Sequence, residues 1–348
     1  MSYLKGYSHL LHVENLRTYF FLEKGVLHAV DGVELWVDSG ETLGIVGESG
    51  CGKSVTALSI IRLISPPGRI VDGKVLFNGI DLLSLKEKEI RKIRGREISM
   101  VFQEPLTSLN PVFTIGYQIG EVIKVHKGGS KKEIEERTVE LLRMVGIPSP
   151  EKRLRSYPHE LSGGMQQRVM IAMAIACHPA LLIADEPTTA LDVTIQAQIL
   201  DLLISLKEKI GMSIIFITHD LGVVAGIAER VAVMYAGRIV ELASTETLFS
   251  NPLHPYTIGL FECLPSIKKE KGELKSISGS IPDSINLPSG CKFHPRCLKS
   301  SKICAEKEPS LQEVYPGHWV RCHKSSPKKD FIKGITHVFK RWTSSQNY

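Results

Sequence analysis

The sequence predicts an α/β fold built on a parallel sheet, and two observations support this prediction. An apolar run at 42–46 leads into a glycine-rich stretch at 47–54, which a helix-like segment follows. Further along the chain, helix-like and strand-like segments alternate, at 165–177, 181–185, 193–208 and 213–218. Such alternation is typical of parallel strands that are joined by helical crossovers.

The remaining pattern adds a β-rich part before this core and a helical part within it. Residues 10–41 alternate as strands do, with turns expected at Gly25 and Asp31-Gly32. Two more strands are expected at 70–78 and 98–102. From about 115 to 168 the apolar residues recur at helical spacing, which predicts a helical insertion.

Composition limits the class of protein. With 348 residues, 43% of them hydrophobic, the chain can form one large domain plus an appendage. No apolar run approaches the roughly 20 residues of a membrane span, and the first residues lack the apolar core of a secretion signal. The net charge is +6, but much of the excess follows Pro265, and no nucleic-acid-binding motif is present. We therefore expect no nucleic-acid partner.

The stretch 47–54 follows a strand and precedes a helix, which is the context of a phosphate-binding P-loop. Its glycines let backbone N–H groups turn toward phosphates, Lys53 adds a positive charge, and the Ser54 hydroxyl is a ligand for Mg²⁺. The motif predicts binding of ATP. The expected binding residues are Gly47, Glu48, Ser49, Gly50, Cys51, Gly52, Lys53, Ser54 and Val55.

A pair of carboxylates follows the apolar run 181–184. At the carboxyl end of a strand and downstream of a P-loop, such a pair is typical of a hydrolytic site. We expect Asp185 to hold Mg²⁺ through water and Glu186 to polarise the water that attacks the γ-phosphate.

The stretch 161–168, with the sequence Leu-Ser-Gly-Gly-Met-Gln-Gln-Arg, resembles the signature of ABC-type ATPases. The Ser162 hydroxyl and the N–H groups of Gly163 and Gly164 form an anion site at a helix N-terminus. The resemblance implies a head-to-tail dimer in which each signature closes over the ATP of the other chain. Met165 departs from the usual glutamine of the superfamily, as is common in its peptide-importer branch.

The resemblance also assigns roles to single residues outside these motifs. The resemblance implies that Phe20 stacks on adenine, with Tyr19 as the alternative. It places Gln103 in the loop that reaches Mg²⁺ and the attacking water, Asp192 in the loop that crosses the dimer interface, and His219 in the switch that contacts the γ-phosphate. All catalytic positions are filled, which implies an active ATPase.

Three segments indicate to which branch of the ABC-type ATPases the chain is most similar: 104–116, 251–257 and 288–297. They resemble the peptide/nickel family of ABC importers, and most closely the "D"-type subunit of oligopeptide and dipeptide importers. The resemblance implies a peripheral protein on the cytoplasmic face of the membrane, with two transmembrane permease subunits, a second ATPase subunit and, indirectly, a solute-binding protein as partners. The second ATPase is expected to be a homologous sister subunit, and a second copy of this chain is the alternative. Oligosaccharide or nickel as solute, and a non-transport ABC ATPase of DNA repair or translation, are the alternatives for function.

Four of the seven cysteines cluster near the C-terminus, in a region rich in loops and proline: Cys291, Cys297, Cys304 and Cys322. We expect a metal there, in place of an apolar core that the region lacks. The C-x₅-C spacing of the first pair suits zinc poorly, although zinc and free thiols remain alternatives. The family resemblance implies a [4Fe–4S] cluster.

The domain division expected from these features has three parts. Residues 1–265 would form the ATPase domain, with the helical insertion at about 115–168, and 266–324 the four-cysteine region. In the tail, 325–348, apolar residues fall on one helical stripe and basic residues largely off it. This predicts a helix that docks on the membrane interface or on the permeases; the alternative is a helix packed on its own domain or a frayed tail.

Overall fold

The computed structural model describes residues 9–103, 108–189, 191–263 and 277–325. The predicted amphipathic tail lies outside these ranges. So do part of the branch-specific segment 104–116 and the first residues of the chain. The three-part domain division stays a prediction.

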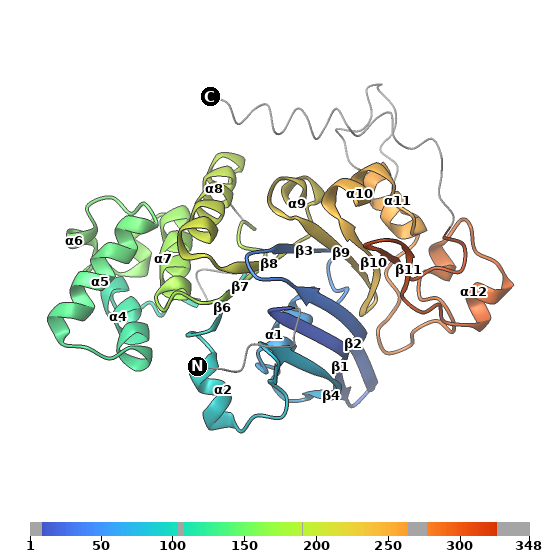
Figure 1. The fold of residues 1–348 in the computed structure, drawn as a ribbon, viewed down its shortest axis with the longest axis horizontal. Helices are drawn as coiled ribbons and strands as arrows, with labels where there is room; N and C mark the ends of the chain where they lie inside the picture. The colour runs from blue at the N-terminus through green and yellow to red at the C-terminus, as the bar shows by residue number, and fades with distance from the viewer. Residues whose placement is uncertain (1–8, 104–107, 190, 264–276, 326–348) are drawn as a thin grey trace.

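One large sheet runs through the middle of the molecule (Figure 1). Five of its strands are parallel neighbours, and three antiparallel strands extend it at one edge. In spatial order the strands are β11 (Gln312–Tyr315), β12 (His318–Val320), β10 (Arg238–Ser244), β9 (Arg230–Tyr235), β3 (Thr42–Val46), β8 (Ser213–Thr218), β7 (Leu181–Asp185) and β6 (Ile98–Val101). The predicted strands at 181–185 and 213–218 have the expected bounds.

A second, antiparallel sheet is formed by β2 (Gly25–Val37), β1 (Leu11–Leu22), β4 (Gly68–Phe77) and β5 (Ile80–Asp81), in that spatial order. The turn expected at Asp31-Gly32 is wrong, because both residues lie inside β2. The positive φ of Gly32, 78°, lies beside register shifts in the pairing of β1 with β2. An irregularity within a strand, rather than a reversal of the chain, therefore accounts for this glycine.

Most of the helices form three groups, and α2 (Glu87–Ile93) and the short α12 (Lys302–Glu306) lie apart from them. Helix α1 (Lys53–Ile60) contacts β1, β2 and β7, between the two sheets. The opposite side of the large sheet is covered by α8 (Val193–Ile210), α9 (Leu221–Ile227), α10 (Thr245–Ser250) and α11 (Pro255–Glu262). At one end of the molecule (Figure 1, green) lie α4 (Ile115–His126), α5 (Lys131–Met144), α6 (Pro150–Arg153) and α7 (Gly163–Ile175), while α2 lies beside the antiparallel sheet.

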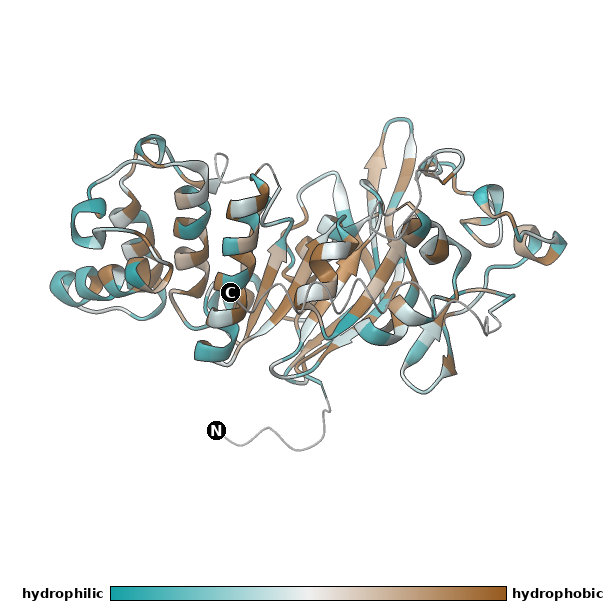
Figure 2. Ribbon diagram, turned by 90° about the horizontal axis from the view of Figure 1, so that it is seen from above, coloured by the Kyte–Doolittle hydropathy of each residue, from teal (hydrophilic) through white to brown (hydrophobic). Residues whose placement is uncertain are grey.

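Two apolar cores lie on the two faces of the large sheet. Along β8, Ile215 and Ile217 pack in the core shared with the antiparallel sheet, whereas Ile214 and Phe216 pack in the core shared with the helices. This alternation follows from the two-residue period of a strand. Both faces are covered, so β8 is apolar at nearly every position, and Figure 2 shows the hydrophobic residues concentrated along these strands.

The C-terminal region is built onto the large sheet. Strand β12 pairs with β10, and its Val320 is 1% exposed. Beside it, the fully buried Glu241 accepts hydrogen bonds from His318 Nε2 (2.7 Å) and from the backbone N–H groups of Leu253 (2.7 Å) and His254 (2.9 Å). The prediction that this region needs a metal to replace a core is therefore wrong, because the region shares the apolar cores of the main domain.

Candidate functional site

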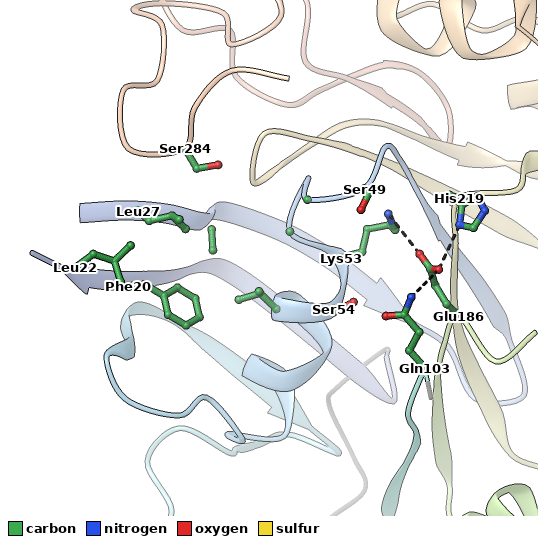
Figure 3. A pocket seen from close by; sticks show the side chains of 14 residues that line it. Phe20, Leu22, Leu27, Ser49, Lys53, Ser54, Gln103, Glu186, His219 and Ser284 are labelled. Carbon is green, nitrogen blue, oxygen red and sulfur yellow. Dashed lines mark hydrogen bonds and ion pairs between the residues drawn. The ribbon is translucent and has the colours of Figure 1, made fainter. Parts of the chain in front are cut away.

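A cavity of about 670 Å³ opens beside the glycine-rich loop (Figure 3). Its lining residues come from the antiparallel sheet, from the P-loop and the start of α1, from the loops that follow β6, β7 and β8, and from the C-terminal region. At one end lie mainly apolar side chains, and at the other a group of charged and polar ones. The lining residues are Phe20, Leu22, Leu27, Ala29, Ser49, Gly50, Gly52, Lys53, Ser54, Val55, Gln103, Glu186, His219 and Ser284.

Close packing shows why the loop needs glycine at two positions. A Cβ added to Gly47 would lie 2.2 Å from the carbonyl oxygen of Met234 on β9. A Cβ added to Gly52 would lie 2.3 Å from the carbonyl oxygen of Ala29 on β2. Both glycines also have positive φ, 158° and 105°. The loop is therefore confined by two strands, and only glycine fits there.

Lys53 is the cation of the cavity and is only 4% exposed. Its Nζ donates hydrogen bonds to the carbonyl oxygens of Gly47 (2.8 Å) and Glu48 (3.0 Å), and lies 4.0 Å from Glu186 Oε1. The ammonium group is thus held by its own loop beside the open cavity. An anion that enters this space meets a buried positive charge.

Ser54, at the start of α1, contacts Asp185, the last residue of β7. The Ser54 hydroxyl donates to Asp185 Oδ1 over 3.0 Å, and Asp185 is 5% exposed. Burial raises the pKa of this carboxyl, while the hydrogen bond from Ser54 lowers it by less. A hydroxyl and a buried carboxylate are oxygen ligands of the kind that Mg²⁺ prefers, so these residues fit the predicted magnesium site.

Glu186 is the centre of the polar group. Its Oε2 accepts hydrogen bonds from Thr189 Oγ1 (2.9 Å) and Gln103 Nε2 (3.1 Å), and lies 3.3 Å from Nδ1 of His219. The backbone of Glu186 has a φ of 44°, which is strained for a side chain with a Cβ. Strain of this kind is concentrated at functional sites. The structure thus brings together the three residues expected to be catalytic: Glu186, His219 and Gln103.

The structure distinguishes the two aromatic candidates. Phe20 lines the apolar end of the cavity (Figure 3), whereas Tyr19 points elsewhere: its hydroxyl donates to Asp31 over 2.8 Å. Four lining residues had not been expected: Leu22, Leu27, Ala29 and Ser284. The apolar pattern around Phe20 could have indicated the two leucines, but no local signal points to Ser284, which is more than 250 residues away along the chain.

Three predicted binding residues of the loop do not line the cavity. Gly47 serves the close packing described above. Cys51 is 1% exposed, and burial raises the pKa of its thiol to about 11. The Glu48 carboxylate pairs with Arg296 of the C-terminal region, at 3.1 Å.

The signature residues and Asp192 also lie outside this cavity. Ser162 caps α7 by accepting from the N–H of Met165, and Asp192 caps α8 by accepting from the N–H of Ile195. Gly163 begins α7, and a Cβ on Gly164 would lie 2.8 Å from Ile195 Cγ2, so a glycine there lets α7 approach α8.

The predicted metal ligands Cys291, Cys297, Cys304 and Cys322 border one small pocket, which has only about 10 Å³ of free space. Burial raises the pKa of the Cys291 thiol to about 11, and also raises the pKa of Cys297 and Cys322. Within the described ranges, no group of three or more His, Cys, Asp or Glu side chains is arranged to hold a metal ion. The predicted [4Fe–4S] cluster, and the zinc alternative, are therefore wrong for this region, where Cys291 and Cys297 pack against the apolar core.

Comparison with known proteins agrees with the geometry of the cavity. Residues 30–189 match the family model "ABC transporter", and residues 240–304 match "Oligopeptide/dipeptide transporter, C-terminal region". The oligopeptide transport ATP-binding protein AppD of Bacillus subtilis is 55% identical over 90% of this chain and 96% of its own length. The chain belongs to the ABC transporter family.

Within this family, the chain is an ATP-binding subunit of the oligopeptide/dipeptide group. The dipeptide transport ATP-binding protein DppD of Escherichia coli is 51% identical, over 90% of this chain and 96% of its own length. The relatives are named as transport ATP-binding proteins, so they support transport rather than DNA repair or translation, and none of the names mentions an iron–sulfur cluster. An ABC ATPase binds ATP and Mg²⁺.

Solved structures resemble the ABC fold of this chain. The dimeric cassette MJ0796 bound to ADP and Pi has a TM-score of 0.61 and 30% identity, over 68% of this chain and 98% of that chain. The cassette cbiO1 of Clostridium perfringens, part of a transporter complex, has a TM-score of 0.58 and 29% identity, over 70% of this chain and 91% of that chain. In the described part of our chain, no helix combines the length and apolarity that a membrane span requires.

Proposed function

We propose that the protein hydrolyses ATP in the cavity beside the P-loop and thereby energises the import of peptides across the cytoplasmic membrane. One observation carries the proposal. Lys53, Glu186 and the hydrogen-bonded pair Ser54–Asp185 lie together at one end of the cavity, and Phe20 lies at the other end. A charged end suits phosphates, and an aromatic end suits a nucleobase. The peptide solute is inferred from relatives that are named for oligopeptide and dipeptide transport.

Each residue has a distinct role in this proposal. Lys53 would exchange its loop carbonyls for phosphate oxygens, which are stronger partners for an ammonium group. Ser54 and Asp185 would hold Mg²⁺, which neutralises developing charge on the phosphates. Glu186 would accept a proton from the attacking water, while Gln103 and His219 fix its carboxylate and orient the water.

The proposal includes a second ATPase subunit. Ser162, Gly163, Gly164 and Asp192 lie outside the cavity, so they would contact ATP only in a head-to-tail dimer. The dimeric arrangement of a similar cassette supports this part. A homologous sister subunit is the expected partner, with a second copy of this chain as the alternative.

The proposal also includes two permease subunits, with the protein bound to the cytoplasmic face of the membrane and a solute-binding protein acting indirectly. A groove of about 1350 Å³ between α4, α5 and α6 is the proposed permease contact. Its lining combines exposed apolar side chains, Val125 (71%) and Tyr117 (52%), with charges of both signs. Such a surface suits an amphipathic helix of a partner.

The groove can be tested with a matched pair of variants. Val125→Asp places a charge in the groove and should weaken co-purification with the permeases, while ATP binding by the isolated chain is kept. Val71→Asp makes the same change on β4, outside the groove, and should leave the complex intact. Equal yields of complex from both variants would remove the groove from the proposal.

The proposed function itself is tested in the assembled transporter, with peptides, oligosaccharides and Ni²⁺ compared as solutes. ATPase activity should rise with a peptide, and Lys53→Ala should abolish it by weakening ATP binding at least roughly a hundredfold, because the main positive charge of the cavity is lost. Lys74→Ala, on the exposed side of β4, is the control. Unchanged ATP binding in the Lys53 variant would place the nucleotide elsewhere, and stimulation by a different solute would overturn the peptide assignment.

A further inference from the structure

Arg296 joins the C-terminal region to the P-loop. Its Nη1 lies 3.1 and 3.2 Å from the two carboxylate oxygens of Glu48, and the Arg296 side chain is only 6% exposed. The same guanidinium donates to the backbone carbonyl oxygens of Ser278 (3.0 Å) and Ile277 (3.3 Å). It also lies over the ring of Tyr235, 5.8 Å from the centroid. The arginine is therefore fixed on several sides, and one of its partners is a P-loop residue.

Glu48 has four partners. Besides the ion pair with Arg296, its backbone N–H donates to the Tyr256 hydroxyl over 3.0 Å, and its carbonyl oxygen accepts from Lys53 Nζ (3.0 Å) and from the N–H of Cys51 (3.3 Å). Tyr256 is fully buried in α11. When Lys53 turns to a phosphate, its contact with this carbonyl is lost, and Arg296 and Tyr256 are the side chains that still hold Glu48, beside the N–H of Cys51 within the loop. The neighbouring residues Ser49 and Gly50 line the cavity, so the position of Glu48 determines where their N–H groups point.

A second contact brings the same C-terminal segment to the other end of the cavity. The carbonyl oxygen of Ser284 accepts from the N–H of His28 on β2 over 2.9 Å, and Ser284 itself lines the cavity opposite Phe20 (Figure 3). The segment 277–297 therefore contacts the P-loop through Arg296 and lines the apolar end of the cavity through Ser284. The same segment also contains two of the four clustered cysteines, Cys291 and Cys297.

We propose that Arg296 is a positioning residue for ATP binding, which acts through Glu48 to hold the P-loop in its binding shape. This inference rests on the proposed use of the cavity by ATP. A loop that is already ordered loses less conformational freedom when ATP binds, so its affinity is higher. Since Arg296 does not touch the cavity, the effect concerns binding more than the chemical step, and it makes nucleotide affinity depend on the C-terminal region.

The test measures ATP affinity and steady-state kinetics for a set of full-length variants. Arg296→Met keeps much of the side-chain volume but removes the charge, and should weaken ATP binding roughly fivefold or more, with kcat at saturating ATP changed by less than about twofold. Arg296→Lys should recover part of the affinity. In Glu48→Gln, adding Arg296→Met should have little further effect, because the two residues act as one unit.

Two further variants distinguish a specific role of Arg296 from general loosening of the C-terminal region. Arg321→Met removes another buried arginine of this region, which donates to the carbonyl oxygens of Ile239 and Pro309 and not to the P-loop. It should leave ATP affinity unchanged. Equal losses in the Arg321 and Arg296 variants would mean general loosening and overturn the inference, as would full affinity in Arg296→Met. Lys53→Ala tests the cavity itself, since retained ATP binding there would remove the proposed function rather than the role of Arg296 alone.

Discussion

The nucleotide cavity and the pocket of the four cysteines differ in how their polar groups are used. The first is open, with about 670 Å³ of free space, and its charged groups face that space. The second has about 10 Å³, and its thiols border packed apolar residues such as Phe293. Burial raises the pKa of three of these thiols, which favours the neutral form that packing requires. A cluster of reactive side chains is therefore a candidate site only where the fold leaves room beside it.

The origin of the difference lies in the distance along the chain between the members of each cluster. Residues 47–54 are contiguous, so the local backbone by itself brings their N–H groups together. The cysteines at 291 and 322 are far apart along the chain, yet both border the same pocket. Their environment is thus set by long-range packing.

The largest effect expected in the C-terminal region is on stability. His318→Ala leaves the fully buried Glu241 without its side-chain donor and should lower the free energy of unfolding by roughly 3–5 kcal/mol. Urea unfolding followed by tryptophan fluorescence measures this, because Trp319 lies next to the substituted residue. His323→Ala, which removes an exposed hydrogen bond to Lys307, is the control and should cost about 1 kcal/mol or less. Equal losses would show that the region does not depend on the buried pair.

A smaller effect should depend on pH through His254, which borders the pocket of the four cysteines. Burial lowers its pKa from 6.5 to about 3. Between these values the unfolded state binds the extra proton, so stability falls as pH falls from about 6.5 toward 3, by up to about 1.4 kcal/mol per pH unit from this residue. His254→Asn keeps an acceptor for the N–H of Tyr256 but cannot titrate, and should have a shallower slope. Unfolding curves from pH 4.5 to 8 with identical slopes would contradict this.

The smallest effect is expected for the cysteines. If they serve packing, Cys297→Ala should cost about 1 kcal/mol, as for other partly buried side chains, and a chelator should not change the stability of the unaltered protein. Metal analysis of protein purified without oxygen is the companion measurement. A loss of several kcal/mol together with release of bound iron or zinc would contradict the packing role.

The sequence predicted those features of the fold that depend on residues close together along the chain. Strands β7 and β8 and the loop between β3 and α1 follow from contiguous apolar runs and glycines. The convergence of Gln103, Glu186 and His219 could also be predicted, because each follows a parallel strand and these strands end at one edge of the sheet.

The features that could not be predicted from the sequence depend on contacts between residues far apart along the chain. The choice between Tyr19 and Phe20 depends on which side chain of β1 meets Asp31 of β2. The contacts of Ser284 and Arg296 join residues about 250 positions apart, and no local pattern encodes them. The extension of the large sheet by β12 was missed for the same reason, and with it the apolar core that the C-terminal region shares.

In the proposed mechanism, Glu186 activates water for ATP hydrolysis while other residues of the cavity bind the nucleotide. ATP binding and ATP turnover in the assembled transporter with Glu186→Gln separate these two roles. We expect ATP affinity within a fewfold of the unaltered complex and a turnover reduced at least roughly a hundredfold, because only the proton acceptor is lost. Turnover at the full rate in this variant would show that Glu186 does not activate the water.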